Sequence, residues 1–391
     1  MDPVRNPYTP GAGSKPPALE GRDAEIRSFE VLLARMLRGR TEKSLFVTGL
    51  RGVGKTVLLG RFRDMAEAGG FHTADTEITH ETEFRSTIAR LTRRVVLALD
   101  PRRRAKEHVR RATAVFKAFT LKLPDGYEIG VDVEALRGSG DSGRLDEDLA
   151  DLFVALGEAA KERSTGVVFL LDEVHFLGRR DLEALIAAVH RVSQRALPLA
   201  VVGAGLPQLP RLAGEAKSYA ERLFDFPVID KLPLPAAREA LEKPAKEQGV
   251  TFEAEATDII LDYTEGYPYF LQEYGKHVWN LAPGPTITSF DSKRARIEVQ
   301  NQLDENFFRV RVSRATNVER QYLAAMAALG KGPYRSGLIA EKLRRASTSV
   351  APVRNILINK GLVYSPSHGI IDFTVPHFDD YLRRTYPSRQ D

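Results

Sequence analysis

The segment "GLRGVGKT", Gly49 to Thr56, decides the predicted fold, because it directly follows the apolar run Leu45-Phe-Val-Thr48. Its spacing matches G-x-x-x-x-G-K-[ST], a glycine-rich loop that joins a strand to a helix. The glycines let backbone N–H groups close around phosphate oxygens, and the helix predicted from about Lys55 to Ala68 points its positive end at them. A plain glycine turn is the alternative, and the strand–loop–helix context favours a phosphate loop.

The loop predicts a set of contacts with a nucleotide. The Lys55 ammonium can reach the β- and γ-phosphates, and the Thr56 hydroxyl can bind Mg²⁺. The predicted nucleotide contacts are Gly49, Arg51, Gly52, Val53, Gly54, Lys55, Thr56 and Val57.

A second motif, "VVFLLDE" from Val167 to Glu173, begins with an apolar run typical of a strand buried on both faces. Asp172 is predicted to hold Mg²⁺, usually through water, and Glu173 to orient and polarise the attacking water. An Asp-Glu pair after a strand is common by itself, but downstream of a matching phosphate loop it becomes specific. We interpret His175 as a packed or capping histidine rather than a catalytic one.

Composition excludes several other classes of site. The 391 residues contain no cysteine, which excludes disulfides, thiolate–zinc sites and thiol nucleophiles. The 8 histidines are scattered and never reach metal-ligand spacing. The apolar runs are too short to span a bilayer, and the first residues lack the form of a signal peptide. We therefore expect a cytoplasmic protein with no membrane contact.

The charge is spread unevenly along the chain. Residues 305–391 carry 14 Lys/Arg against 7 Asp/Glu, and Arg93 to Lys122 carry 10 against 2. This asymmetry suggests a partner that bears phosphates, although a solvated helix face is the usual explanation for a charge run.

Periodicity divides the chain into four parts. Strands alternate with helices up to about residue 204, which predicts a doubly wound α/β domain with a parallel sheet. The predicted parts are an extended arm (1–18), a nucleotide-binding core (19–231), an all-α lid (232–304) and a C-terminal domain (305–391). An insertion at about 91–136 contains a predicted strand at 127–133 and has no assigned role.

The phosphate loop, the strand ending in Asp-Glu and the order of elements around them resemble an AAA+ P-loop ATPase. The nearer likeness is to the origin-initiator-like, archaeal-ATPase-like branch and to the STAND switch ATPases. "PPALEGRDAEIRSF", Pro16 to Phe29, resembles the P-x-x-L-x-G-R-[DE] stretch of these families. The resemblance implies that Leu19, Gly21 and Arg22 line the adenine pocket; a simple helix cap is the alternative.

Two features depart from, or extend, this resemblance. The strand that normally ends in a polar sensor ends here in Gly203-Ala-Gly205, which predicts slow hydrolysis; Gln208 could substitute, or could be merely solvated. "YAERLFDF", Tyr219 to Phe226, resembles the segment that carries the arginine finger. Arg222 would then complete the site of a neighbouring subunit, which implies self-association; an ordinary surface ion pair is the alternative.

In the lid, Gly266-Tyr267-Pro268 resembles the G-x-P motif with which STAND lids contact nucleotide. Glycine permits a close backbone approach, and proline suits the first turn of a helix. No sensor arginine is visible in the lid, so the resemblance implies a lid that reads the nucleotide state. A plain loop-to-helix junction is the alternative for this motif.

The sequence of the C-terminal domain predicts a winged helix. Helices are expected at 318–329, 336–343 and 349–360, with Pro352 in a first turn, followed by strands at 362–364 and 370–375 around the turn "SPSHG". In such folds the third helix enters the DNA major groove. The residues placed to meet phosphates are Arg344, Arg345, Arg354 and Lys360.

Together these features predict an ATP-binding, slow Mg²⁺-dependent ATPase that acts as a nucleotide-dependent switch on duplex DNA. The alternative is a STAND-like signalling ATPase whose winged helix binds protein or autoinhibits.

Overall fold

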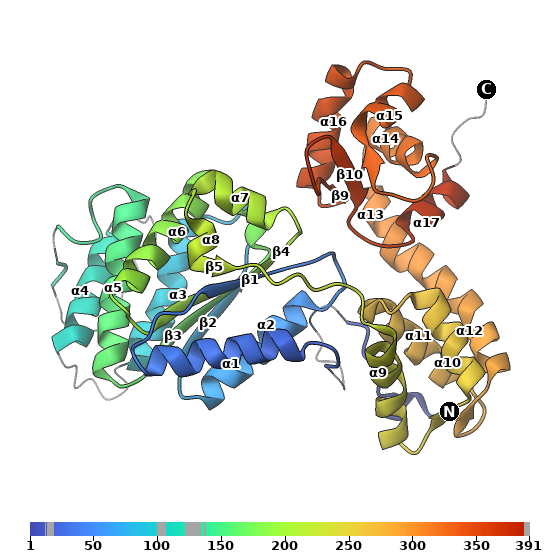
Figure 1. Ribbon diagram of the computed structural model, residues 1–391, viewed down its shortest axis with the longest axis horizontal. Helices are drawn as coiled ribbons and strands as arrows, with labels where there is room; N and C mark the ends of the chain where they lie inside the picture. Colours follow the sequence, from blue (N-terminus) through green and yellow to red (C-terminus); the bar gives the residue numbers. More distant parts are fainter. Residues whose placement is uncertain (12, 14–18, 100–106, 122–133, 137, 387–391) are drawn as a thin grey trace. The chain divides into compact units, whose positions relative to one another are not determined.

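The computed structural model describes the chain except for residues 12, 14–18, 100–106, 122–133, 137 and 387–391 (Figure 1). The described residues form two compact units. The sheet unit contains Arg22–Gly49 and Lys55–Ile229, and the lid unit contains Met1–Gly21, Leu50–Gly54 and Asp230–Asp391. The phosphate loop is therefore shared, since its middle residues belong to the lid unit.

The sheet unit is built on a parallel sheet of five strands in the order β2-β3-β4-β1-β5. The strands are β1 (Ser44–Thr48), β2 (His72–Glu77), β3 (Val167–Asp172), β4 (Leu199–Gly205) and β5 (Phe224–Asp225). Every residue of β1 and β4 is buried, which fits their largely apolar sequences. The predicted α/β fold class is confirmed.

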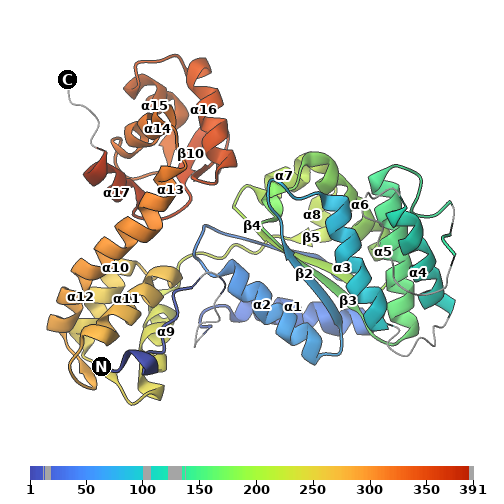
Figure 2. The same cartoon turned by 180° about the vertical axis from the view of Figure 1, so that it is seen from behind.

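Helices cover both faces of this sheet, with α1 and α2 on one side and α3 to α6 on the other (Figures 1 and 2). The helices of the unit are α1 (Asp23–Leu37), α2 (Lys55–Ala68), α3 (Phe84–Leu99), α4 (Glu107–Thr120), α5 (Leu145–Glu162), η2 (Val174–Phe176), α6 (Arg179–Gln194), α7 (Leu209–Ala216) and α8 (Ala220–Leu223). The predicted insertion contributes α4, whose apolar residues pack on α5. The strand predicted at 127–133 lies outside the described residues.

The lid consists of four helices and a small sheet. The helices are α9 (Leu234–Glu247), α10 (Ala254–Thr264), α11 (Pro268–Leu281) and α12 (Ser289–Gln302). Contrary to the expected all-α lid, β6 (Thr251–Phe252) and β7 (Thr286–Ile287) pair in parallel. Strands of two residues are too short to produce a recognisable alternation.

The N-terminal arm packs on the lid helices. Its described residues include one short 3₁₀ helix, η1 (Pro3–Arg5). Tyr8 is 3% exposed and its hydroxyl donates to the Leu241 carbonyl at 2.5 Å. The Trp279 indole N–H donates to the Asp2 carbonyl at 3.0 Å. Distant ends of the lid unit are thus joined.

The C-terminal domain has the element order predicted for a winged helix, with additions. Its elements are η3 (Leu303–Phe308), α13 (Arg309–Ser313), α14 (Asn317–Ala327), β8 (Tyr334–Arg335), α15 (Ser336–Lys342), α16 (Ser347–Asn359), β9 (Val363–Tyr364), β10 (Ile370–Phe373) and α17 (Phe378–Thr385). The strands form an antiparallel sheet in the order β8-β10-β9. The sequence did not predict β8 or α17.

One detail of the third helix was wrong. Because α16 begins at Ser347, Pro352 lies inside the helix instead of in its first turn. Its ring removes one backbone N–H donor, yet the helix continues to Asn359. Among the described helices of both units, none is long and apolar enough to cross a membrane.

Candidate nucleotide site

The sheet unit brings together the two sequence motifs at the carboxyl ends of its strands. The Thr56 hydroxyl donates to Asp172 Oδ2 at 2.5 Å. The Glu173 N–H donates to Asp172 Oδ1 at 2.8 Å. Lys55 is 6% exposed, and its ammonium donates to the Gly49 carbonyl at 2.9 Å. Residues 116 positions apart in the chain therefore form one polar cluster.

This cluster has the oxygen ligands that suit Mg²⁺. The ion prefers hard oxygen ligands and usually keeps several waters, with one or two protein oxygens and substrate phosphates completing its shell. Thr56 Oγ1 and Asp172 Oδ2 are adjacent and supply such a pair. The described residues contain no group of three or more acidic or histidine side chains that could form a metal cage. Thr56 and Asp172 therefore fit a Mg²⁺ ion that is also held by nucleotide phosphates, and not an ion held by protein ligands alone.

In the lid unit, Arg51 and Gly52 are held by three backbone contacts. The Tyr267 hydroxyl donates to the Arg51 carbonyl. The Tyr269 N–H donates to the Gly52 carbonyl at 3.2 Å, and the Arg51 N–H donates to the Thr374 carbonyl at 3.1 Å. The lid and the C-terminal domain thus both contact this part of the loop.

Glycine is required at two positions of these contacts. Gly52 has φ +86°, and a Cβ there would lie 2.9 Å from the Tyr267 ring. Gly361 has φ +64°, and a Cβ there would lie 2.5 Å from a guanidinium nitrogen of Arg51. Residues that carry a side chain rarely adopt this left-handed backbone conformation. The sequence motif predicted Gly52, whereas Tyr269, Gly361 and Thr374 were missed because no local motif marks them.

The predicted adenine and lid residues are partly brought together. A Cβ on Gly21 would lie 3.0 Å from Ala236 and 3.4 Å from the Leu232 side chain. The Gly266 carbonyl accepts a hydrogen bond from the Leu232 N–H at 2.8 Å. The two glycines therefore approach Leu232 closely, at the start of the lid.

The other predicted residues of the adenine and lid motifs, Pro268, Leu19 and Arg22, lie in different parts of the two units. Pro268 is the first residue of α11, as predicted. Leu19 is half-buried in the lid unit, and Arg22 is buried in the sheet unit.

A buried arginine that the sequence did not single out lies near Arg51. Burial, and then the positive charge of Arg51, lower the pKa of Arg311 to about 10. The Arg311 guanidinium lies 3.6 Å from the centre of the Phe307 ring and donates to the Phe307 carbonyl at 2.7 Å. Two guanidinium groups in a partly buried region create a positive potential that favours an anion. Arg311 lies in α13, beyond the lid segment in which a sensor arginine was sought.

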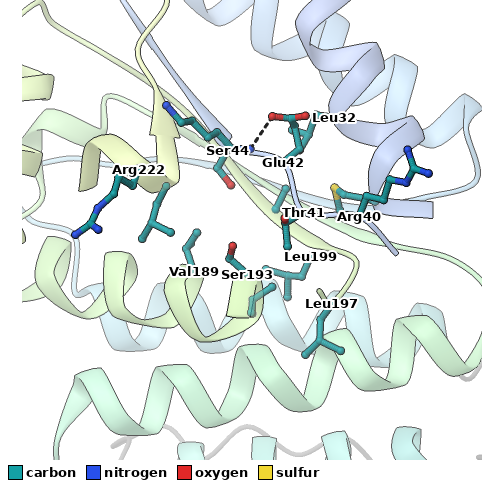
Figure 3. Close-up of a pocket in the computed structure, with 15 residues that line it drawn as sticks. Leu32, Arg40, Thr41, Glu42, Ser44, Val189, Ser193, Leu197, Leu199 and Arg222 are labelled. Atoms are coloured by element: carbon teal, nitrogen blue, oxygen red, sulfur yellow. Dashed lines mark hydrogen bonds between the residues drawn. The ribbon is translucent and has the colours of Figure 1, made fainter. Parts of the chain in front are cut away.

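Arg222 lies near the amino end of β1, whereas the phosphate loop follows its carboxyl end. It is exposed on α8, just before β5, whose Phe224 pairs with Ser44 at the amino end of β1. It lines a cavity of about 170 Å³ together with residues of the segment 40–44 and of α6 (Figure 3). The loop follows the carboxyl end of β1, so a finger role for Arg222 requires the site of a neighbouring copy.

The end of β4 explains the missing sensor side chain. A Cβ on Gly203 would lie 2.8 Å from both Phe46 and Val174, and one on Gly205 would lie 2.9 Å from Leu209. There is no space for a polar side chain at either position. Gln208 is only 8% exposed, and its side-chain oxygen accepts no hydrogen bond from the described residues. The alternative that Gln208 is merely solvated is therefore wrong.

The four predicted DNA-contacting residues differ in their availability. Arg344 and Arg345 are exposed, and Arg354 is half-buried near the Ser336 hydroxyl at 3.5 Å. Lys360 instead donates to Glu319 at 2.6 Å and to the Arg314 carbonyl at 2.8 Å. Burial alone would raise the pKa of Glu319, but hydrogen bonds from Lys360 and Thr316 lower it below its usual value. Lys360 is also exposed, and its ammonium group is engaged by residues of its own domain.

Comparison with known families places the sheet unit. A family model described as "AAA ATPase domain" matches residues 18–202. Residues 18–202 are an AAA+ P-loop ATPase domain. In this ATPase, residues 305–382 also match a family described as "Domain of unknown function (DUF8462)". Among curated proteins, none matches the chain significantly.

Of the similar solved structures, one supports the fold of the ATPase. The Walker-type ATPase PABY2304 of Pyrococcus abyssi is 14% identical with a TM-score of 0.58, covering 93% of this chain and 96% of that one. The Aeropyrum pernix Orc1 protein, solved in complex with DNA, is 17% identical with a TM-score of 0.45, covering 97% and 96%. The RuvB Holliday junction branch migration motor of Thermotoga maritima is 16% identical with a TM-score of 0.45, covering 95% and 99%. At these identities, the Pyrococcus structure supports the fold alone.

Proposed function

We propose that this ATPase is a slow, Mg²⁺-dependent nucleotide switch whose winged-helix domain acts on duplex DNA. The observation that carries the switch is the hydrogen bond from the Arg51 N–H to the Thr374 carbonyl. In a phosphate loop, backbone N–H groups donate to phosphate oxygens. Nucleotide and the C-terminal domain therefore compete for the same donor, and binding of one loosens the hold of the other.

The proposed site assigns each residue a physical task. The loop from Gly49 to Val57 surrounds the phosphates, with Lys55 neutralising their charge. Thr56 and Asp172 hold Mg²⁺, which offsets the charge on the phosphates when bound. Glu173 orients the attacking water. The residues proposed to contact the base and to sense the nucleotide are Leu19, Gly21, Arg22, Gly266 and Pro268.

Slow turnover follows from the end of β4, where glycines leave no polar side chain beside the γ-phosphate position. We expect turnover at or below roughly 1 s⁻¹, the lower end of typical enzyme rates. The proposed Arg222 finger would raise this rate only when a second copy is present.

The test of this site is Glu173→Gln, which keeps the shape of the side chain and removes its basicity. ATP affinity by calorimetry should stay within about twofold, while phosphate release should fall by roughly 100-fold or more. Glu30→Gln, on the exposed face of α1, is the matched control. If Glu173→Gln releases phosphate as fast as the parent, the attacking water is activated by another group.

DNA as the target is supported by the excess of positive charge in residues 305–391 and by the exposure of Arg344 and Arg345. The second candidate is a STAND-like signalling ATPase whose winged helix docks protein or covers the loop. The Arg51–Thr374 hydrogen bond favours this candidate too, because it needs no DNA. Binding of the full chain to duplex DNA at low salt, with and without Mg-ATP, separates the two. If no duplex binds under either condition, the signalling function is the one that remains.

A further inference from the structure

His175 lies between Glu173 and the end of β4. Its Nδ1 atom is 3.3 Å from Glu173 Oε2 and 3.3 Å from the Leu206 amide nitrogen. The imidazole side chain is only 2% exposed. A buried histidine thus links the proposed base to the strand that lacks a sensor side chain.

The Nδ1 atom can serve only one of these two neighbours at a time. The Leu206 N–H is a donor and the Glu173 carboxylate is an acceptor, whereas an imidazole nitrogen either carries a proton or offers a lone pair. With its lone pair, Nδ1 accepts from Leu206; with its proton, it donates to Glu173 Oε2. The neutral ring needs no net gain or loss of a proton to exchange one hydrogen bond for the other.

The surrounding structure fixes the ring in this place. The His175 ring packs on Phe176 with the ring centres 4.2 Å apart, and Phe176 packs on His80 at the same distance. Gly205 provides the space, since a Cβ there would lie 3.3 Å from Nδ1. Gly205, which excludes a sensor side chain from the end of β4, therefore admits the imidazole instead.

The backbone of Glu173 points to the same arrangement. Its φ of +54° and ψ of +36° lie in the left-handed region. For a residue other than glycine this costs about 1–3 kcal/mol, and such residues cluster at functional sites. The turn η2 that follows is short, and it returns the chain so that His175 faces the carboxylate.

We propose that His175 is a positioning residue for ATP hydrolysis, whose Nδ1–H holds Glu173 Oε2 so that the other carboxylate oxygen faces the attacking water. Exchange of this hydrogen bond for the one from Leu206 releases Glu173 and couples the base to the end of β4. The inference rests on the proposed role of Glu173. It replaces the interpretation of His175 as a residue that only packs or caps.

Three substitutions separate positioning from packing. His175→Phe keeps an aromatic ring but has no nitrogen. His175→Asn places an amide group near the Nδ1 position, and His175→Gln extends the amide toward the Nε2 position. We expect His175→Phe to lower kcat by roughly 10- to 100-fold, the cost of a misplaced catalytic group, with ATP affinity by calorimetry within about twofold. His175→Asn should recover most of kcat, and His175→Gln should not.

A double-variant measurement distinguishes this inference from the proposed function. In the Glu173→Gln background, His175→Phe should cause little further loss, because the two residues act as one unit. A His175→Phe variant with the parent kcat, or an equal loss of kcat in His175→Asn and His175→Phe, would overturn the positioning role. If Glu173→Gln itself keeps full turnover, the role of Glu173 fails, and the inference about His175 falls with it.

Discussion

The two ends of the phosphate loop are held by different parts of the molecule. Lys55 and Thr56 are fixed by the Gly49 carbonyl and by Asp172, all within the sheet unit. Arg51 and Gly52 are fixed by Tyr267, Tyr269 and the Thr374 carbonyl, all within the lid unit. These partners of Lys55 and Thr56 belong to the sheet unit, and these partners of Arg51 and Gly52 belong to the lid and the C-terminal domain. The difference teaches where the proposed switch would divide its tasks, with nucleotide chemistry at one end of eight consecutive residues and control at the other.

The largest expected effect is at the chemical end of the loop. Lys55→Ala should weaken ATP binding by roughly 30-fold or more, because truncating one partner of a buried charge pair costs about 2–5 kcal/mol. Calorimetric titration with Mg-ATP measures this. Lys43→Ala, which removes an exposed lysine paired with Asp225, is the control and should bind as the parent does. Unchanged affinity in a folded Lys55→Ala variant would remove the nucleotide-site assignment.

A smaller effect of opposite sign is expected at the control end. Tyr267→Phe removes the hydroxyl that donates to the Arg51 carbonyl and so destabilises the conformation in which the lid holds the loop. A net hydrogen bond contributes about 1 kcal/mol, so ATP should bind roughly fivefold more tightly.

The matched control is Tyr274→Phe, which removes a similar buried hydrogen bond, to the Ser292 carbonyl at 2.7 Å, that does not involve the loop. It should lower the melting temperature without tightening ATP binding. Weaker ATP binding by Tyr267→Phe would mean that the tyrosine supports the bound state instead.

The smallest effect concerns the C-terminal domain. Duplex affinity should fall with salt because each neutralised phosphate releases counterions. Arg344→Ala and Arg345→Ala should each flatten the logarithmic salt slope by about one unit, whereas Lys161→Ala on α5 should leave it unchanged. Fluorescence anisotropy at several salt concentrations measures the slope. If both arginine variants keep the salt slope of the parent protein, Arg344 and Arg345 do not contact phosphates.

Lys360 is expected to behave differently from these arginines, because it is engaged by Glu319. Lys360→Ala should mainly lower stability. Since the pKa of folded Glu319 is depressed, its stabilising contribution is present above its unfolded pKa and is lost as the pH falls through the folded value. The stability difference between parent and variant should therefore shrink in acid, as thermal melting at several pH values would show.

Much of the fold was predictable because its signals are local. The runs at β1, β3 and β4 are largely apolar, and helices between them have buried apolar faces. The Thr56–Asp172 cluster was predictable because both motifs end or follow strands of one parallel sheet. In contrast, β6 and β7 are too short to leave a pattern.

The rest of the site depends on contacts between distant segments. The Thr374 carbonyl is a backbone atom, so no side chain in the sequence marks its contact with Arg51. No motif in the sequence marks Arg311 as part of the site. The proposed role of His175 depends on its burial and on its two neighbours at 3.3 Å, which the sequence does not show. Gly361 and Gly205 were visible as glycines, while the groups they make room for were not.

The central claim is that nucleotide displaces the C-terminal domain from Arg51. Amide hydrogen exchange of the full chain, with and without Mg-ATP, tests it most directly, with Lys55→Ala as the control that should not respond. The account predicts slower exchange at residues 49–56 together with faster exchange at residues 361–375 when ATP binds. Slower exchange at 49–56 with no change at 361–375 would contradict it, because the loop would then bind nucleotide without leaving Thr374.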